Sequence, residues 1–506
     1  PAKISVQGAF LQVDPGQTIS LVGGDVDIIE GAILIAPGGV VQIGSVASAG
    51  EAGLFAPDGT PALDLGAFAT LGKVEISGGG GISVSGPDAG LPGGRVVIRS
   101  GQLIVDGAVI VNDTGDLAGA PLVGIDLGAT ESIDLKNGAL VQTTSGAADA
   151  SGISIATGGK LSVTDSAIES TALDGRTGAI NVQVGTADLL NGVIRTSSVA
   201  GGAGNITIGA SGKVMLSGPT STISTETFSS DPAVFAGNIS LDAGNVILAD
   251  QATIRNGGLL GQGGDTLRVS ATDSIMISGL AGISSQSFSA DVGLVDISAP
   301  RVTLDGGFIN TSTLGVGNAG RVLVTAGTVS LTNEAQITSS SQGVAPGAGG
   351  DIELNATNSV SIKSGAGIFA TAEGPGRAGS IRITTPSFDV QNGLVTTASA
   401  QAAGGDISIT TTGSLVHLTN SQITTSVHGG DGGGGDIAIG SSLVVLDDSK
   451  VLAQAFGGPG GNINITADVF LVNSGGIVPS SLVGIVDASS KLSTPGIIDI
   501  QAAVTD

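Results

Sequence analysis

The sequence has no cysteine, no tryptophan and no tyrosine, and it has little phenylalanine. Of its 506 residues 11 are phenylalanine, whereas 86 are glycine. Without cysteine the chain can form neither a disulfide nor a thiolate metal site. Without aromatic bulk its core must consist of valine, isoleucine, leucine and alanine, which with many serines and threonines favour β-strands in regular layers. An apolar content of 41% against a charged content of 12% excludes intrinsic disorder.

Basic residues and long apolar runs are also scarce. The chain has 18 lysines and arginines against 43 aspartates and glutamates, a net charge of −25. A surface this acidic repels phosphate backbones, so we expect no nucleic-acid partner. No uninterrupted apolar run reaches the roughly 18 residues that a membrane-spanning helix needs. We therefore expect that the chain does not span a membrane.

A short phrase, glycine followed by alternating apolar residues, recurs along most of the chain. It reads GNITI at Gly204, GDISI at Gly405 and GNINI at Gly461, and it returns at a mean spacing of about 29 residues from Gly94 to Gly496. No helical period is sustained anywhere. A regular period of this length predicts a repeat architecture.

Each repeat holds two further apolar segments after the glycine phrase. The second is a short segment such as VML (214–216) or VSL (329–331), and the third follows a polar corner, as in NSQITTS (420–426). Three short strands per repeat cannot bury an apolar face alone, but stacked coils can pair in parallel and bury continuous columns. We therefore predict an all-β, right-handed parallel β-helix with three short strands and about 29 residues per coil. The leucine pattern of a leucine-rich repeat is absent, and the period is too short for a β-propeller blade.

The repeat divides the chain into three parts. Residues 91–495 are regular β-helix repeats, and residues 496–506 form a terminal coil. Residues 1–90 keep the strand pattern without the clean period, which is common in terminal coils of repeat proteins. We read this part as atypical first coils with an excursion around residues 49–66.

The pattern resembles the filamentous haemagglutinin-like exoproteins of Gram-negative two-partner secretion systems. Residues 16–46 are similar to the end of the secretion domain of that family, and residues 486–506 are similar to a closing coil. The resemblance implies passage through a dedicated outer-membrane transporter, an extracellular or cell-surface location, adhesion, and no shared catalytic residues. The early Asn-Pro motif of the family is absent, so we expect a leader and further first coils ahead of Pro1 in the full protein.

Some β-helix proteins are polysaccharide lyases or hydrolases, so acidic pairs need attention. Asp447 and Asp448 are adjacent, but successive strand residues point to opposite faces, and a corner is the better interpretation. The lysines and arginines form no cluster, and tryptophan and tyrosine, the usual sugar platforms, are missing. The sequence therefore predicts no enzyme, no catalytic residue and no cofactor.

The two histidines and three aspartates are the candidate metal ligands in the sequence. His417 lies in the middle of a second strand, where its ring is expected to face solvent, and His428 lies in a corner. Two imidazoles without a third ligand make a poor metal site. Calcium on Asp351, Asp406 or Asp436 is conceivable, but other coils carry Asn, Arg or Ser at this position, so no metal site is predicted. Asn-x-Ser/Thr triplets are by-products of the repeat; they begin at Asn205, Asn238, Asn310 and Asn355.

The stretch GGDGGGGDIAIG (429–440) contains a G-x-G-x-x-G pattern at Gly430, Gly432 and Gly435. A dinucleotide site would need a helix after it, whereas a strand is expected, so we interpret it as a lengthened corner. The leading hypothesis is a non-enzymatic, secreted, adhesin-like β-helical rod that presents surface loops to an unknown surface or glycan ligand. The alternative is a structural subunit that self-associates into an extracellular filament or sheath.

Overall fold

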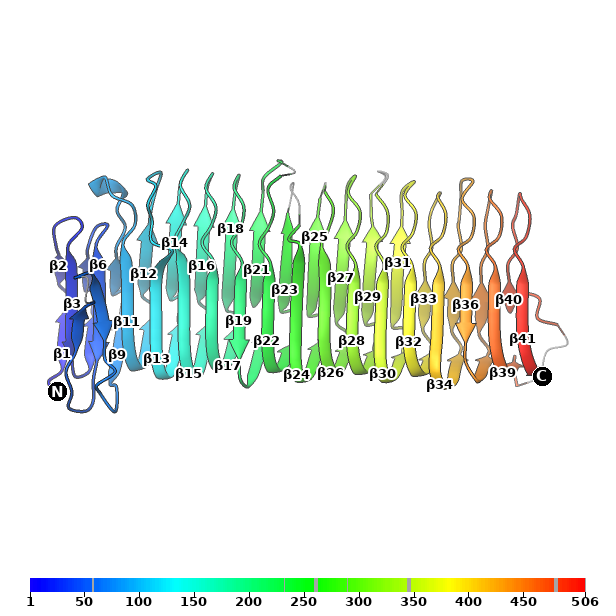
Figure 1. Cartoon of the computed structure of the whole chain (residues 1–506), viewed down its shortest axis with the longest axis horizontal. Coiled ribbons are helices and arrows are strands. Elements are labelled where there is room, and N and C mark those ends of the chain that lie inside the picture. Colours follow the sequence, from blue (N-terminus) through cyan, green and yellow to red (C-terminus); the bar gives the residue numbers. More distant parts are fainter. Residues whose placement is uncertain are drawn as a thin grey trace. The chain divides into compact units, whose positions relative to one another are not determined.

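The computed structural model describes residues 1–56, 59–231, 233–258, 263–288, 290–343, 347–476 and 481–505. They form an all-β parallel β-solenoid with about 28 residues per coil and three strands per turn. The predicted fold class is confirmed, and the repeat is one residue shorter than predicted. Within each of the two compact units described below, the coils follow one another in sequence order (Figure 1).

The chain divides into two compact units. Unit 1 contains Pro1–Ile247 and Ala252–Asn256, and unit 2 contains Leu248–Gln251 and Gly257–Asp506. Each unit contains a parallel sheet of long strands and a parallel sheet of short strands, called here the long-strand sheet and the short-strand sheet. The boundaries predicted from the repeat, at residues 91 and 496, stay a prediction.

The strands of unit 1 alternate between these two sheets in chain order. Its long-strand sheet contains β1 (Ile4–Gln7), β3 (Thr18–Gly23), β4 (Val26–Ile29), β6 (Val40–Ser45), β9 (Lys73–Ser77), β11 (Arg95–Asp106), β13 (Val123–Lys136), β15 (Gly152–Thr164), β17 (Ile180–Leu190), β19 (Ile206–Ala210) and β20 (Lys213–Ser217). Its short-strand sheet contains β2 (Phe10–Gln12), β5 (Ile33–Ile35), β10 (Gly81–Ser83), β12 (Val109–Asp113), β14 (Leu140–Ser145), β16 (Ala167–Ala172), β18 (Val193–Ser198) and β21 (Thr222–Thr227). Two strands contain residues of both units, β22 (Ile239–Leu248) and β23 (Thr253–Gly258).

Unit 2 follows the same alternation. Its long-strand sheet contains β24 (Thr266–Ser278), β26 (Leu294–Asp305), β28 (Val322–Thr332), β30 (Ile352–Lys363), β32 (Ile381–Gln391), β34 (Ile407–Thr419), β36 (Ile437–Gly440), β37 (Leu443–Asp447), β39 (Ile463–Asn473) and β41 (Ile498–Thr505). Its short-strand sheet contains β25 (Gly282–Ser287), β27 (Phe308–Thr313), β29 (Gln336–Ser341), β31 (Gly367–Ala372), β33 (Leu394–Thr396), β35 (Gln422–Thr424), β38 (Lys450–Leu452) and β40 (Val486–Asp487).

In most coils the first two predicted strands run together as one long strand. In β15, for example, the pairing with β17 shifts between Thr157 and Lys160, which marks a bend inside the strand. The bend separates the glycine phrase from the second apolar segment. The two segments remain separate strands in β19 and β20 and in β36 and β37.

The excursion predicted in the first 90 residues is present. Strands β7 (Gly53–Phe55) and β8 (Pro61–Asp64) form an antiparallel pair between β6 and β9. Strand β6 pairs with the first half of β11, and β9 pairs with its second half. The excursion is therefore inserted at the bend of a single coil. A 3-10 turn at Pro87–Ala89 precedes β11.

The core of each unit consists of aligned aliphatic side chains. In unit 1, Ile155, Val182, Ile208 and Leu241 occupy successive rungs. Each is at most 1% exposed. Unit 2 repeats this arrangement along β32, β34, β36 and β39. Burial of each such side chain contributes about 1.5–3 kcal/mol, so the columns carry much of the stability of the stack.

The glycine that opens each coil is required by close contact with the coil before it. A Cβ atom on Gly405 would overlap the carbonyl oxygen of Gly379, and one on Gly435 would overlap that of Gly405. The carbonyl of Gly435 also accepts a hydrogen bond from Thr425 Oγ1, at 2.5 Å, on the inward side of the third segment. The recurring glycine and the inward threonine therefore act together at the same position of each coil.

Candidate functional site

The two histidines lie on different parts of the coil. His417 lies on the outer face of β34, with its Nδ1 atom 3.2 Å from Asp389 Oδ1 and its Nε2 atom 3.2 Å from Thr419 Oγ1. Its side chain is 36% exposed. His428 is exposed in the loop after β35. The two histidines therefore belong to different elements of the coil. Within the described ranges no three His, Asp or Glu side chains gather in a way that could hold a metal ion.

Asp447 and Asp448 lie at a corner, as predicted. Asp448 has a left-handed backbone, with φ of 47°. Asp447 Oδ1 accepts a hydrogen bond from Asn473 Nδ2 at 2.7 Å, and Asp448 Oδ1 accepts one from the backbone N–H of Gly475 at 2.6 Å. Both carboxylates therefore stabilise the corner of the next coil. Short Asn and Asp side chains suit such positions because they tolerate this conformation and bond locally.

The three aspartates considered for calcium have a structural role. Asp406 Oδ1 accepts a hydrogen bond from the backbone N–H of Asp436 at 2.9 Å, and Asp351 Oδ1 accepts one from that of Ser380 at 2.8 Å. Asp436 does the same for Asn462 at 2.7 Å. Each carboxylate satisfies a backbone donor one coil further on. An asparagine can replace the aspartate because only one acceptor oxygen is used.

The four Asn-x-Ser/Thr asparagines occupy two kinds of position. Asn205 belongs to the same series of acceptors, since its Oδ1 accepts a hydrogen bond from the backbone N–H of Asn238 at 2.9 Å. Asn310 and Asn355 lie on β27 and β30, where they alternate with buried residues and are half-buried. In the glycine-rich stretch, residues 429–436 belong to the corner between β35 and β36, and residues 437–440 are strand β36 rather than the start of a helix.

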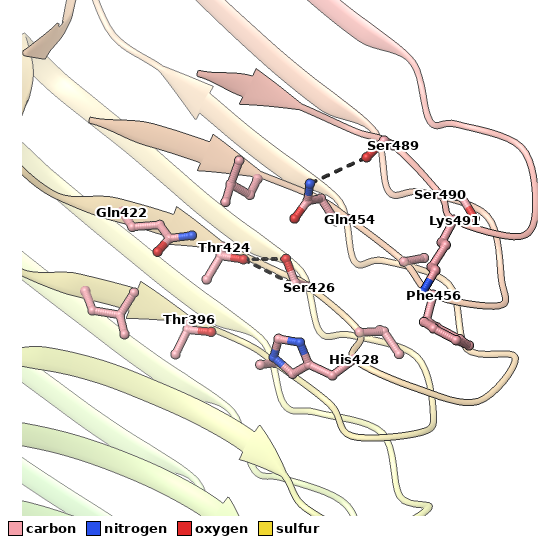
Figure 2. Close-up of a pocket in the computed structure, with 15 residues that line it drawn as sticks. Thr396, Gln422, Thr424, Ser426, His428, Gln454, Phe456, Ser489, Ser490 and Lys491 are labelled. Carbon is pink, nitrogen blue, oxygen red and sulfur yellow. Dashed lines mark hydrogen bonds between the residues drawn. The ribbon is translucent and has the colours of Figure 1, made fainter. Parts of the chain in front are cut away.

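A groove of about 780 Å³ lies on the short-strand sheet of unit 2. Strands β33, β35 and β38, the loops after them and the loop after β40 form it. The lining side chains come from four consecutive coils, as Figure 2 shows. We call this hollow the C-terminal groove. It is lined by Leu394, Thr396, Ala398, Gln422, Thr424, Ser426, Val427, His428, Leu452, Gln454, Ala455, Phe456, Ser489, Ser490 and Lys491.

Small polar side chains form the floor of the groove. Thr396 pairs with Thr424 on the next rung, and both alternate along their strands with fully buried aliphatic residues. They are therefore on the outward face, yet they are 6% and 8% exposed. Thr424 Oγ1 lies 2.7 Å from Ser426 Oγ. Larger residues around these short side chains make the surface concave.

The rim combines an amide, an aromatic ring and a cation. Gln454 Nε2 donates to Asp487 Oδ2 at 2.7 Å and lies 3.5 Å from Ser489 Oγ. Lys491 Nζ lies 4.8 Å from the centre of the Phe456 ring, a cation–π contact that is drawn in Figure 2. No carboxylate is among the lining residues within the described part of the chain. The groove offers hydroxyl, amide and ring contacts but no acid pair for glycoside hydrolysis.

A second hollow of about 600 Å³ adjoins the first at the corner of the same coils. It shares Leu394 and Gln422 with the C-terminal groove and adds Asn392, Asn420 and Lys450. The short-strand sheet of unit 2 therefore carries a polar depression that extends from its corner to its loops.

Sequence reasoning missed the groove because it looked for platforms of tryptophan or tyrosine. Phe456 and Lys491 lie 35 positions apart in the sequence, and the pairing of Ala455 with Ser490 is what brings them together. The repeat could have supplied a signal, since each of these residues directly follows the third segment of its coil. That position is occupied by His428 one coil earlier.

Comparison with known proteins gave no matching family model, no matching curated protein and no matching solved structure. Among the described residues, no helix is both long and apolar enough to cross a membrane.

Proposed function

We propose that this chain is a non-enzymatic, secreted, adhesin-like β-helical scaffold that binds a surface ligand through the C-terminal groove. The observation that carries the proposal is the composition of the groove. Four consecutive coils supply stacked hydroxyl and amide groups with an aromatic ring at the rim, and no carboxylate lines it in the described part of the chain. Such a surface can hold a polar, uncharged ligand by many weak contacts, and it lacks the paired acids that cleavage would need.

The cellular setting is part of the same proposal. The resemblance of residues 16–46 and 486–506 to filamentous haemagglutinin-like exoproteins supports export by an outer-membrane transporter of the two-partner type in a Gram-negative bacterium. Residues 16–46 lie in the first coils, from β3 to β6. A β-helix suits this setting because its coils form from local segments and neighbouring rungs, so they can assemble one after another.

Binding to immobilised neutral polysaccharides tests the proposal. The purified chain is passed over surfaces coated with cellulose, mannan or chitin, and retention is compared with that of a Gln454→Ala/Phe456→Ala variant. We expect the wild type to bind at least one of them, and the variant to bind it about tenfold more weakly because ring and amide contacts are lost. Release of reducing ends by the wild type would contradict the non-enzymatic assignment.

A matched control changes the equivalent sheet of unit 1. Glu169 and Arg195 form an ion pair at 2.9 Å on the outer face of β16 and β18. A Glu169→Ala/Arg195→Ala variant should bind like the wild type. Equal loss of binding in both variants would contradict a role for the C-terminal groove. Regular fibres in negative-stain images of the wild type would support the filament alternative instead.

A further inference from the structure

A separate hollow of about 370 Å³ lies on the short-strand sheet of unit 2, between the outward residues of β27 and β29. Phe308 forms part of its lining, together with Asn310, Gln336 and Thr338. Along β27, Phe308 and Asn310 are half-buried and alternate with fully buried Ile309 and Thr311. The phenylalanine and the amide therefore face outward, next to one another on the surface.

The Phe308 ring occupies the space beside a glycine of the neighbouring strand. Gly282 is the direct partner of Phe308 on β25, and a Cβ atom on Gly282 would overlap the ring. The absence of a side chain at Gly282 lets the ring lie across the sheet. The ring remains half-exposed in this position. The sheet thus holds the ring as a surface on which a ligand can lie. In the sequence Phe308 is an isolated phenylalanine, and nothing there marks it as part of a surface.

A second ring connects this hollow with the C-terminal groove. Phe369 lies on β31 and folds back over Gly367, because a Cβ atom on that glycine would overlap the Phe369 ring. Gly367 pairs with Gln336 on one side and with Leu394 on the other. Leu394 already lines the C-terminal groove. Phe308, Gln336, Phe369, Leu394 and Gln422 thus form a strip that combines three apolar side chains with two amides.

The chemistry of this strip suits a neutral saccharide chain. A sugar ring has an apolar C–H face that can lie on a phenylalanine ring, and its hydroxyls pair with amides. Asn310 adds an amide to the lining of the hollow, and its Nδ2 donates a hydrogen bond to Ser312 Oγ at 3.4 Å. The five residues of the strip are uncharged; Glu334 lines the hollow and Lys491 lines the groove, so each subsite has a single charge beside it. The net charge of −25 disfavours polyanions.

We propose that the hollow beside Phe308 is a second saccharide subsite, and that it holds the same neutral polysaccharide chain as the C-terminal groove. This inference rests on the proposed function, since it names the ligand class of that surface and extends it. Asn310 of the hollow and Leu452 of the C-terminal groove lie five rungs apart along the register, through Thr338, Phe369, Thr396 and Thr424. At about 4.8 Å per rung the two subsites are roughly 24 Å apart, so one oligosaccharide of sufficient length would contact both.

Chain-length dependence tests the second subsite. The affinities of the purified chain for a neutral β-glucan trisaccharide and decasaccharide are measured by isothermal titration calorimetry. Once a ligand is held at one subsite, its binding to the other is intramolecular and adds affinity. We therefore expect the decasaccharide to bind at least tenfold more tightly than the trisaccharide. Phe308→Ala should remove about that tenfold gain. Gln336→Ala, at an exposed position that leaves the ring in place, should remove part of it.

The control is Phe228→Ala, which removes a phenylalanine that is 38% exposed in unit 1. It should leave the affinities for both oligosaccharides unchanged. Circular dichroism shows that each variant retains its β-structure. If the wild type binds the decasaccharide and neither Phe308→Ala nor Gln336→Ala weakens that binding, the second subsite is overturned. The proposed function then still stands. Binding of neither oligosaccharide by the wild type would overturn the saccharide assignment, and failure on every polysaccharide surface would overturn the proposed function as well.

Discussion

The short-strand sheets of the two units are both built from parallel strands of successive coils, but their outer faces differ. In unit 1 the outward positions of neighbouring strands carry opposite charges, as in the pair between Glu169 and Arg195. A second pair joins Glu226 and Arg255 at 2.5 Å. In unit 2 the corresponding face of β27 to β35 carries phenylalanine, asparagine, glutamine and threonine. Because inward residues alone form the columns of the stack, the outer face of each unit can vary without changing the coil.

The two faces also differ in strand length. Strands β14, β16, β18 and β21 of unit 1 have six residues each, whereas β33, β35 and β38 of unit 2 have three and β40 has two. Where the strands are short, their outward side chains and the following loops form the C-terminal groove. The difference is local to the C-terminal groove, since β25, β27, β29 and β31 of unit 2 also have six residues and β2, β5 and β10 of unit 1 have three.

The largest expected effect tests whether both units depend on the glycines that contact the backbone of the preceding coil. Gly178 in unit 1 and Gly405 in unit 2 each stand where a Cβ atom would overlap backbone of the preceding coil. We expect Gly178→Val and Gly405→Val each to destabilise the fold by about 3 kcal/mol or more, because neither backbone can move aside. Thermal unfolding followed by circular dichroism measures this. Gly440→Ala is the control, since its Cβ would meet no atom within 4 Å.

A smaller effect tests the inward hydroxyl groups. Thr196 Oγ1 donates to the carbonyl of Gly204 at 2.7 Å in unit 1, as Thr425 does to Gly435 in unit 2. Thr196→Val or Thr425→Val leaves that carbonyl without its partner, and should lower the free energy of unfolding by about 1–2 kcal/mol in either unit. Chemical denaturation provides the measurement. Thr410→Val, on the exposed side of β34, should change stability by less than about 0.5 kcal/mol. A similar loss of stability in the Thr196, Thr425 and Thr410 variants would contradict a specific contribution of the inward hydroxyl groups.

The smallest effect concerns the charged outer face of unit 1. Asp188 lies 3.0 Å from Lys160 Nζ and 3.1 Å from Lys213 Nζ. Burial alone would raise the pKa of the Asp188 carboxyl, but hydrogen bonds and charges from the two lysines outweigh it and lower that pKa. A lowered pKa means that the contribution to stability is complete above the ordinary aspartate pKa and is lost as the pH falls through the folded value.

We therefore expect Asp188→Asn to lower stability near neutral pH by about 0.5 kcal/mol or less, because solvent screens a carboxylate that is one third exposed. In strongly acidic solution the variant and the wild type should be equally stable. Denaturant unfolding at both pH values provides the comparison. A deficit that persists in acid would mean that Asp188 acts by packing rather than by charge.

Much of the fold could be predicted from the sequence because its rules are local and repeated. The glycine of each coil, the alternating aliphatic residues and the inward threonine recur at a nearly fixed spacing, and stacking turns that spacing into columns. The corner role of Asp447 and Asp448 followed from the same pattern. The hydrogen bonds of Asp351, Asp406 and Asp436 to the next coil did not, because they depend on side-chain direction at the corner.

The sequence by itself determined the class of fold, the identity of the inward columns and the absence of an evident catalytic motif. Only the tertiary structure decided which outward residues lie together. Phe456 and Lys491, or Phe308 and Gly282, are distant in the chain and belong to different coils, so their contact depends on the register between rungs. Outward positions are free of the constraint that fixes the core. The repeat indicates where the outward positions lie, but the residue types at those positions change from coil to coil, and the candidate binding surface arises from that variation.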